Sequence, residues 1–145
     1  MARLASFPAK SLVLLAAIFL SACGSNRQLQ SVSISPASAD AKNFPNGKVP
    51  FIATGTFSSA PSPATLTSKD VVWCYGGLTN VANPTAGMCA GNIAQFADVD
   101  QNGVAQCAPA FQGTVFILAG AQPVSMNPDG GSQLKIYGSA QLTCP

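Results

Sequence analysis

The stretch LKIYGSAQLT at residues 134–143 carries the pattern that decides the fold. Apolar or small side chains at every second position alternate with Lys135, Tyr137, Ser139, Gln141 and Thr143. This two-residue period is typical of a β-strand that buries one face. Just upstream, TVFILA at residues 114–119 is continuously apolar, which favours a strand in the centre of a sheet.

Five further segments indicate strands, and no window of useful length shows the 3.6-residue period of a helix. Val32 and Ile34 alternate with serines until Pro36 ends an edge strand. Asn102-Gly103 predicts a hairpin. The other strand segments are 49–57, in which Ile52 breaks the alternation, 71–75, 93–98 and 104–107; turns are predicted at 42–48 and 127–131, and loops at 58–68 and 76–92. About seven strands predict an antiparallel β-sandwich of one domain over residues 31–145.

The composition excludes several classes of function. The chain has 145 residues, with seven Lys and Arg, five acidic residues that are all Asp, and no His. Its charged fraction of 8% is far below the ~25% of a typical soluble domain and argues against nucleic-acid binding, which needs a basic stripe. Without His, the usual general base and the usual zinc ligand are missing.

The N-terminus has the pattern of a secretory signal. Arg3 and Lys10 precede the apolar run SLVLLAAIFL at 11–20, and small residues follow it before Cys23. The run is about half of the ~20 residues that a membrane-spanning helix needs. Residues 1–22 are therefore predicted to be a cleaved signal peptide.

The tetrapeptide LSAC at residues 20–23 resembles the lipobox of bacterial lipoproteins. The resemblance implies that Cys23 is lipidated and becomes the first residue, and that residues 23–30 tether the domain to a membrane. It also implies an outer-membrane location, because Gly24 stands where an Asp commonly signals retention in the inner membrane. Removing 22 residues leaves 123 with five basic and five acidic side chains, so no net charge remains.

Four cysteines follow the anchor: Cys74, Cys89, Cys107 and Cys144. An even number in an exported chain predicts two disulfides, for which three pairings exist. No CxxC spacing or His supports a metal site, and no neighbouring positive charge supports a reactive thiol. We expect neither metal nor cofactor.

The strand segments resemble the bacterial immunoglobulin-like group 2 family, found in adhesins and other envelope proteins. The resemblance rests on five motifs in order: Val32-Ser33-Ile34-Ser35-Pro36, Phe51-Ile52-Ala53-Thr54-Gly55, Val71-Val72-Trp73, Ala97-Asp98-Val99-Asp100-Gln101-Asn102-Gly103-Val104 and Gly113-Thr114-Val115-Phe116-Ile117-Leu118-Ala119. It implies an immunoglobulin-like β-sandwich. The segment 76–92 and the four cysteines depart from the family pattern.

If the strands of that sandwich alternate in direction, all four cysteines lie at one pole. There the disulfides would hold the loop 76–92, and their adjacency favours the pairs Cys74–Cys89 and Cys107–Cys144.

Three groups of side chains are candidates for chemistry. Asp98, Asp100, Asn102 and Gly103 match the first half of a calcium loop, but Pro109 stands where the loop needs Glu, so a capped turn is expected. Trp73 shares a strand face with Val71 and is expected in the core. Tyr75 and Tyr137 are expected to be exposed, where they would contact a ligand.

These observations predict a non-enzymatic, lipid-anchored envelope protein. Its sandwich would serve as a binding, adhesion or structural module with the membrane and a protein or carbohydrate as partners. The alternatives are carbohydrate recognition by the disulfide-stapled pole and a small envelope hydrolase, which the missing His disfavours.

Overall fold

The computed structural model describes residues 27–78, 87–90, 95–126 and 132–145. The predicted signal 1–22, Cys23 and the predicted turn at 127–131 lie outside the described residues. The strands are β1 Leu29–Ser35, β2 Ser38–Asp40, β3 Lys48–Pro50, β4 Ile52–Phe57, β5 Ala64–Thr65, β6 Val72–Leu78, β7 Ala97–Val99, β8 Val104–Cys107, β9 Gly113–Met126 and β10 Ser132–Cys144, with two 3-10 helices, η1 Ala41–Asn43 and η2 Pro45–Gly47.

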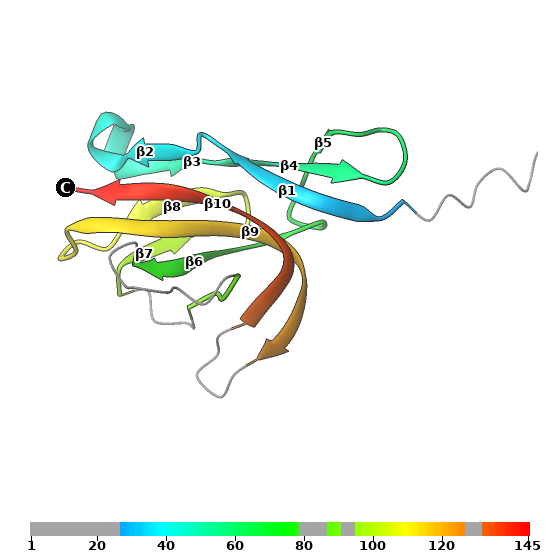
Figure 1. The fold of residues 1–145 in the computed structure, drawn as a ribbon. Helices are drawn as coiled ribbons and strands as arrows, with labels where there is room; N and C mark the ends of the chain where they lie inside the picture. Colours follow the sequence, from blue (N-terminus) through cyan, green and yellow to red (C-terminus); the bar gives the residue numbers. More distant parts are fainter. Residues whose placement is uncertain (1–26, 79–86, 91–94, 127–131) are drawn as a thin grey trace, which may run out of the picture.

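The strands form two layers that face each other (Figure 1). One layer contains β1-β4-β5 and β3-β8-β7, which are continuous because only Phe51 separates β3 from β4. The other is the four-stranded sheet β2-β10-β9-β6. Apart from the parallel pair of β2 and β10, the strands pair antiparallel. The order is that of an immunoglobulin-like sandwich, which confirms the predicted fold class.

The core forms where the inward faces of both layers meet. Its largest fully buried side chains are Phe51, Val49, Val115, Ile117 and Leu142. Phe51 and Val49 come from one layer and the other three from β9 and β10, so the apolar positions of the predicted alternation meet across the interface. Ile52, which broke the pattern in the sequence, is 55% exposed on the opposite face of its strand.

Most predicted strands are present, but several bounds differ. β6 extends to Leu78, into the predicted loop 76–92, and β9 extends to Met126, beyond the predicted 114–119. β7 begins at Ala97, although a strand was predicted over 93–98.

The predicted strand 49–57 is divided into β3 and β4, and the short β2 and β5 were not predicted. β2 forms because the chain crosses to the second layer after Pro36 and pairs with the end of β10, Ser38 opposite Gln141. β1 begins at Leu29, two residues before the predicted start of the domain. The predicted hairpin is confirmed, with Val99 opposite Ala105.

Within residues 27–78, 87–90, 95–126 and 132–145, the structure contains no helix with the length and apolar character needed to cross a bilayer.

Replacing Ile117, which has no exposed surface, by Ala is expected to lower the free energy of unfolding by about 2–5 kcal/mol, because it leaves a cavity between the layers. Ile52→Ala is the matched control, since Ile52 is 55% exposed and should cost less than about 1 kcal/mol. Urea unfolding measures both values. Equal losses for the two variants would contradict the placement of β9 in the core.

Candidate functional site

The two tyrosines predicted to contact a ligand lie in different environments. Tyr75 is only 8% exposed, and the edge of its ring meets Phe96 at 6.3 Å between ring centroids. Burial raises the pKa of the Tyr75 phenol above its ordinary value. The predicted exposure of Tyr75 is therefore wrong. It shares the inward face of the strand segment with Val71 and Trp73, and that alternation outweighs the polar loop that follows.

Tyr137 lies on β10 and is half-buried against a second apolar cluster, which is separate from the main core. This outer cluster consists of buried Cys89, Leu118 and Leu134, with Cys74, Phe116 and Tyr137 packed against it. Because Tyr75 belongs to the main core and Tyr137 to the outer cluster, the two side chains form no common site.

The cysteines are paired as the sequence favoured. Cys74 joins Cys89 with 5.5 Å between Cα atoms, and Cys107 joins Cys144 with 5.7 Å. The expectation that all four lie at one pole is wrong. Cys74 lies within β6 opposite Leu118, whereas Cys144 lies opposite Gly113, five residues away along β9 and hence roughly 16 Å.

The Cys74–Cys89 disulfide holds residues 87–90 over the outer cluster. Ala90 N donates a hydrogen bond to Tyr75 O (2.9 Å), and Leu134 N donates one to Gly87 O (2.9 Å). Leu118 is thereby only 5% exposed although it points away from the main core. This segment closes the sheet face at the outer cluster.

The half-match to a calcium loop is a capped turn. One oxygen of the Asp100 carboxylate accepts hydrogen bonds from the backbone N–H groups of Asn102 (2.8 Å) and Val104 (2.9 Å). Gly103 adopts a φ of +81°, and a Cβ there would lie 2.5 Å from Phe51 O, so the turn requires glycine. Among the residues that the structure describes, no three His, Cys, Asp or Glu side chains gather as a metal site would need.

The end of β10 lies beside the turn that contains η1 and η2, at one end of the sandwich (Figure 1). A groove of about 330 Å³ lies there. We call it the distal groove, because β1 begins at the opposite end. Its lining includes Lys42, Phe44, Asn46, Gln106, Cys107 and Phe111. Phe44 and Phe111 are both half-buried.

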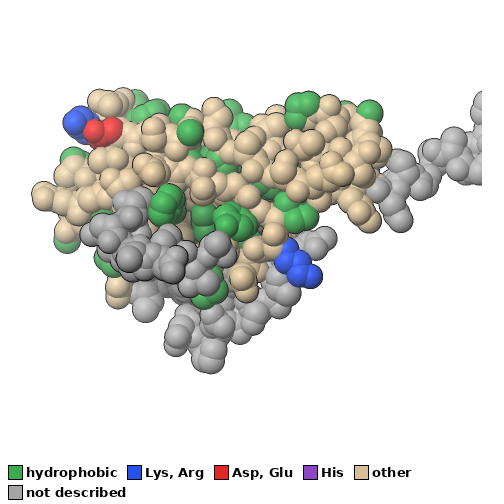
Figure 2. All heavy atoms as spheres, viewed as in Figure 1, with side chains coloured by type: hydrophobic (Ala, Val, Ile, Leu, Met, Phe, Trp, Pro, Cys, Tyr) green, Lys and Arg blue, Asp and Glu red, His purple; other side chains and the backbone are tan. Residues whose placement is uncertain are grey.

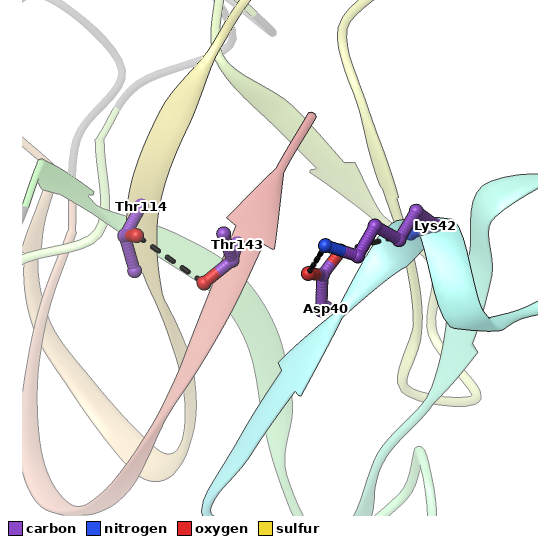
Figure 3. Close-up of polar contacts among 4 residues, drawn as sticks. All are labelled: Asp40, Lys42, Thr114 and Thr143. Carbon is purple, nitrogen blue, oxygen red and sulfur yellow. Dashed lines mark hydrogen bonds and ion pairs between the residues drawn. The ribbon is translucent and has the colours of Figure 1, made fainter.

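Hydrogen bonds within residues 40–44, together with one from Gln106 on β8, fix the η1–η2 wall of the distal groove. Asp40 Oδ1 accepts from Lys42 N (3.1 Å), and Asp40 Oδ2 pairs with Lys42 Nζ at 3.0 Å (Figure 3). The hydrogen bond from Lys42 lowers the pKa of the Asp40 carboxyl. Phe44 N donates to Ala41 O (3.1 Å), and Gln106 Nε2 donates to Asn46 O at a long 3.5 Å.

The Cys107–Cys144 disulfide and Phe111 fix the other wall. The disulfide links the end of β8 to the end of β10 beside the groove. Phe111 packs on Phe96 with 5.0 Å between ring centroids, and Phe96 in turn packs on Tyr75. This row of rings connects the groove to the core.

Different contacts hold the end where β1 begins, beside a second groove of about 610 Å³ whose lining includes Arg27, Phe57 and Ile136. The Arg27 guanidinium carbon lies 3.5 Å from the centre of the Phe57 ring, and Arg27 donates a hydrogen bond to Pro61 O (2.5 Å). Gln28 and Ser58 exchange two hydrogen bonds, Gln28 N to Ser58 Oγ (3.0 Å) and Ser58 N to Gln28 O (2.9 Å). We call these contacts of Arg27 and Gln28 the N-terminal clasp.

Comparison with known proteins assigns no class to this chain. No family model matches the sequence, and a search of curated proteins also finds no match. The site therefore has to be interpreted from its own geometry.

The two disulfides should differ in their effect on stability. Replacing Cys107 and Cys144 together by Ala is expected to lower the free energy of unfolding by about 4 kcal/mol, and replacing Cys74 and Cys89 by about 3 kcal/mol, because the pairs are 37 and 15 residues apart. Urea unfolding of both double variants measures the losses. The variant lacking all four cysteines, which should not respond to reductant, is the control; a parent protein equally insensitive to reductant would contradict the bonds.

The N-terminal clasp makes a separate prediction. Arg27→Ala should lower the free energy of unfolding by about 1–2 kcal/mol, because it removes a cation–π contact and a hydrogen bond to a backbone carbonyl. Lys69→Ala is the control, since Lys69 is another exposed cation. Thermal unfolding measures both, and an Arg27 variant as stable as the Lys69 variant would show that the clasp contributes nothing.

Proposed function

We propose that this chain is a lipid-anchored protein of the bacterial cell envelope whose immunoglobulin-like sandwich is a non-enzymatic binding or structural module. The observation that carries the proposal is the N-terminal clasp. The chain is bound to the domain from Arg27 onward, at the end opposite the distal groove. A lipid on Cys23 would therefore hold that end of the sandwich near the membrane.

The distance to the membrane follows from the covalent chain. Four residues lead from Cys23 to Arg27, and four residues span at most about 14 Å when fully extended. The tether expected over residues 23–30 is thus shorter than its sequence suggests, because the clasp and β1 use residues 27–30. On this proposal the domain stands on the membrane with the distal groove turned away from it.

The disulfides support an exported location. Both bonds persist only in an oxidising compartment, such as the bacterial envelope. The outer membrane is the membrane we propose, since Gly24 follows the lipidated cysteine. The relation to the bacterial immunoglobulin-like group 2 family is also a proposal, supported by the order in which the five motifs fall on β1, β4, β6, the β7–β8 hairpin and β9.

Three of the five Asp carboxylates have local structural roles, which supports a module without catalysis. Asp40 is paired with Lys42, and Asp100 caps the β7–β8 turn. Asp70 accepts hydrogen bonds from the backbone N–H (2.8 Å) and hydroxyl (2.7 Å) of Thr67, and these bonds lower the pKa of its carboxyl. Carboxylates held as acceptors in turns are poor candidates for general acids or bases.

Lipidation of Cys23 is the test of the proposal. Expression of the full chain in a Gram-negative host with an alkyne analogue of palmitate should label the protein and recover it with the membranes. Cys23→Ala should lose both the label and the membrane association, because the thiol carries the lipid. The Cys74→Ala/Cys89→Ala variant is the control and should keep the label. A parent protein without label, or a labelled Cys23→Ala protein, would refute the anchor.

A further inference from the structure

We infer that the distal groove binds a neutral saccharide, with one or two sugar rings seated between Phe44 and Phe111. The inference rests on the proposed function only for the direction in which the groove faces. The ligand class follows from the lining, the charge, the size and the rigidity of the groove.

The lining combines two kinds of contact that sugars use. Phe44 and Phe111 each contribute a half-buried ring, and such rings offer apolar surface to the C–H faces of a sugar. Asn46 and Gln106 are exposed and bring amide groups to the same groove. A side-chain amide contains both a donor and an acceptor, so it matches a hydroxyl group, which also has both.

The charge of the groove favours a neutral ligand. Lys42 is the charged side chain in its lining, and Asp40 holds its ammonium group at 3.0 Å. Charged side chains are also sparse among the described residues on the face drawn in Figure 2. A phosphate, a sulfated sugar or an acidic peptide would meet no cation there that lacks a counter-charge.

The volume of the groove and the pairing of the strands beside it favour a saccharide over a peptide. A volume of about 330 Å³ lies at the lower end of the ~300–1,000 Å³ of ligand sites, which suits one or two rings better than a peptide segment. β8, which carries Gln106 and Cys107 of the lining, pairs with β3 on one side and with β7 on the other, so neither edge of β8 is free. Addition of a peptide strand needs an edge whose backbone groups are free.

The groove is also preorganised. The Cys107–Cys144 disulfide, the Phe96–Phe111 ring pair and the hydrogen bonds of η1 and η2 hold its walls before any ligand binds. A preformed site loses little conformational entropy on binding, which matters for a small polar ligand whose gross interaction energy is modest. We expect dissociation constants on the order of 1 mM for single short saccharides.

Titration of the full chain in detergent, followed by amide chemical shifts, tests the inference. The probes are maltotriose, cellotriose and chitotriose, with trigalacturonate as the anionic control and the tripeptide Ala-Phe-Ala as the peptide control. At least one neutral saccharide should shift residues 41–47 and 106–111, which surround the groove. Phe44→Leu, which keeps an apolar side chain but loses the ring, should weaken that binding about tenfold.

Phe116→Leu is the matched control. Phe116 is half-buried like Phe44 but packs against the outer cluster, so its variant should bind as the parent does. Gln106→Ala supplies a second variant that spares the packing, and it should weaken binding through loss of the amide. The inference is overturned if no neutral saccharide shifts the groove, if trigalacturonate or the tripeptide binds more tightly, or if Phe116→Leu weakens binding as much as Phe44→Leu. None of these results depends on whether Cys23 is lipidated.

Discussion

Burial of residues 115–120 of β9 on both faces of the strand is the constraint on which the rest of the structure depends. Val115 and Ile117 point into the main core and have no exposed surface. Leu118, between inward-facing neighbours, points the other way and is covered by residues 87–90, which the Cys74–Cys89 disulfide holds in place. A strand that is apolar on both faces must be packed on both sides. The continuous apolar run of β9 therefore depends on the main core on one face and on the disulfide-bonded segment 87–90 on the other.

The two ends of the sandwich differ because different contacts hold them. Non-covalent contacts of Arg27 and Gln28 hold the chain to the domain at the end where it enters. At the other end, the Cys107–Cys144 disulfide and the two 3-10 helices leave the distal groove between them. The groove is thus a consequence of how the last strands are linked. Its lining comes from segments 41–47 and 106–111 and from Pro145, which are distant in sequence.

The sequence predicted what depends on local periodicity and missed what depends on tertiary contacts. Alternation identified β10, and Asn102-Gly103 identified the β7–β8 hairpin, because both signals lie within a few residues. Alternation also placed Tyr75 on the same strand face as Val71 and Trp73. The predicted exposure of Tyr75 was wrong because this strand face, and not the polar loop that follows, decides its burial. The common pole of the cysteines was wrong because Cys74 lies within β6 and not at its end.

The groove could not be predicted because Phe44, Gln106 and Phe111 meet only after β8 and β10 are joined. The usable signal was an aromatic residue inside turn sequences, Phe44 in KNFPNGK and Phe111 beside Gln112-Gly113. An aromatic side chain in a turn has no strand face on which to be buried. It therefore either covers an end of the core or stays partly open to solvent, and Phe44 and Phe111 do both.

The scarcity of charged side chains also limits how this protein can recognise a partner. Asp40, Asp70 and Asp100 are each held by neighbours within four residues, so their fields act over a few ångströms and order turns. A surface of this kind exerts little attraction on a distant charged partner, because long-range steering needs clustered charge of one sign. Whatever binds here must be recognised at contact distance, by shape, apolar surface and hydrogen bonds, and the distal groove offers all three from side chains that the fold already holds in place.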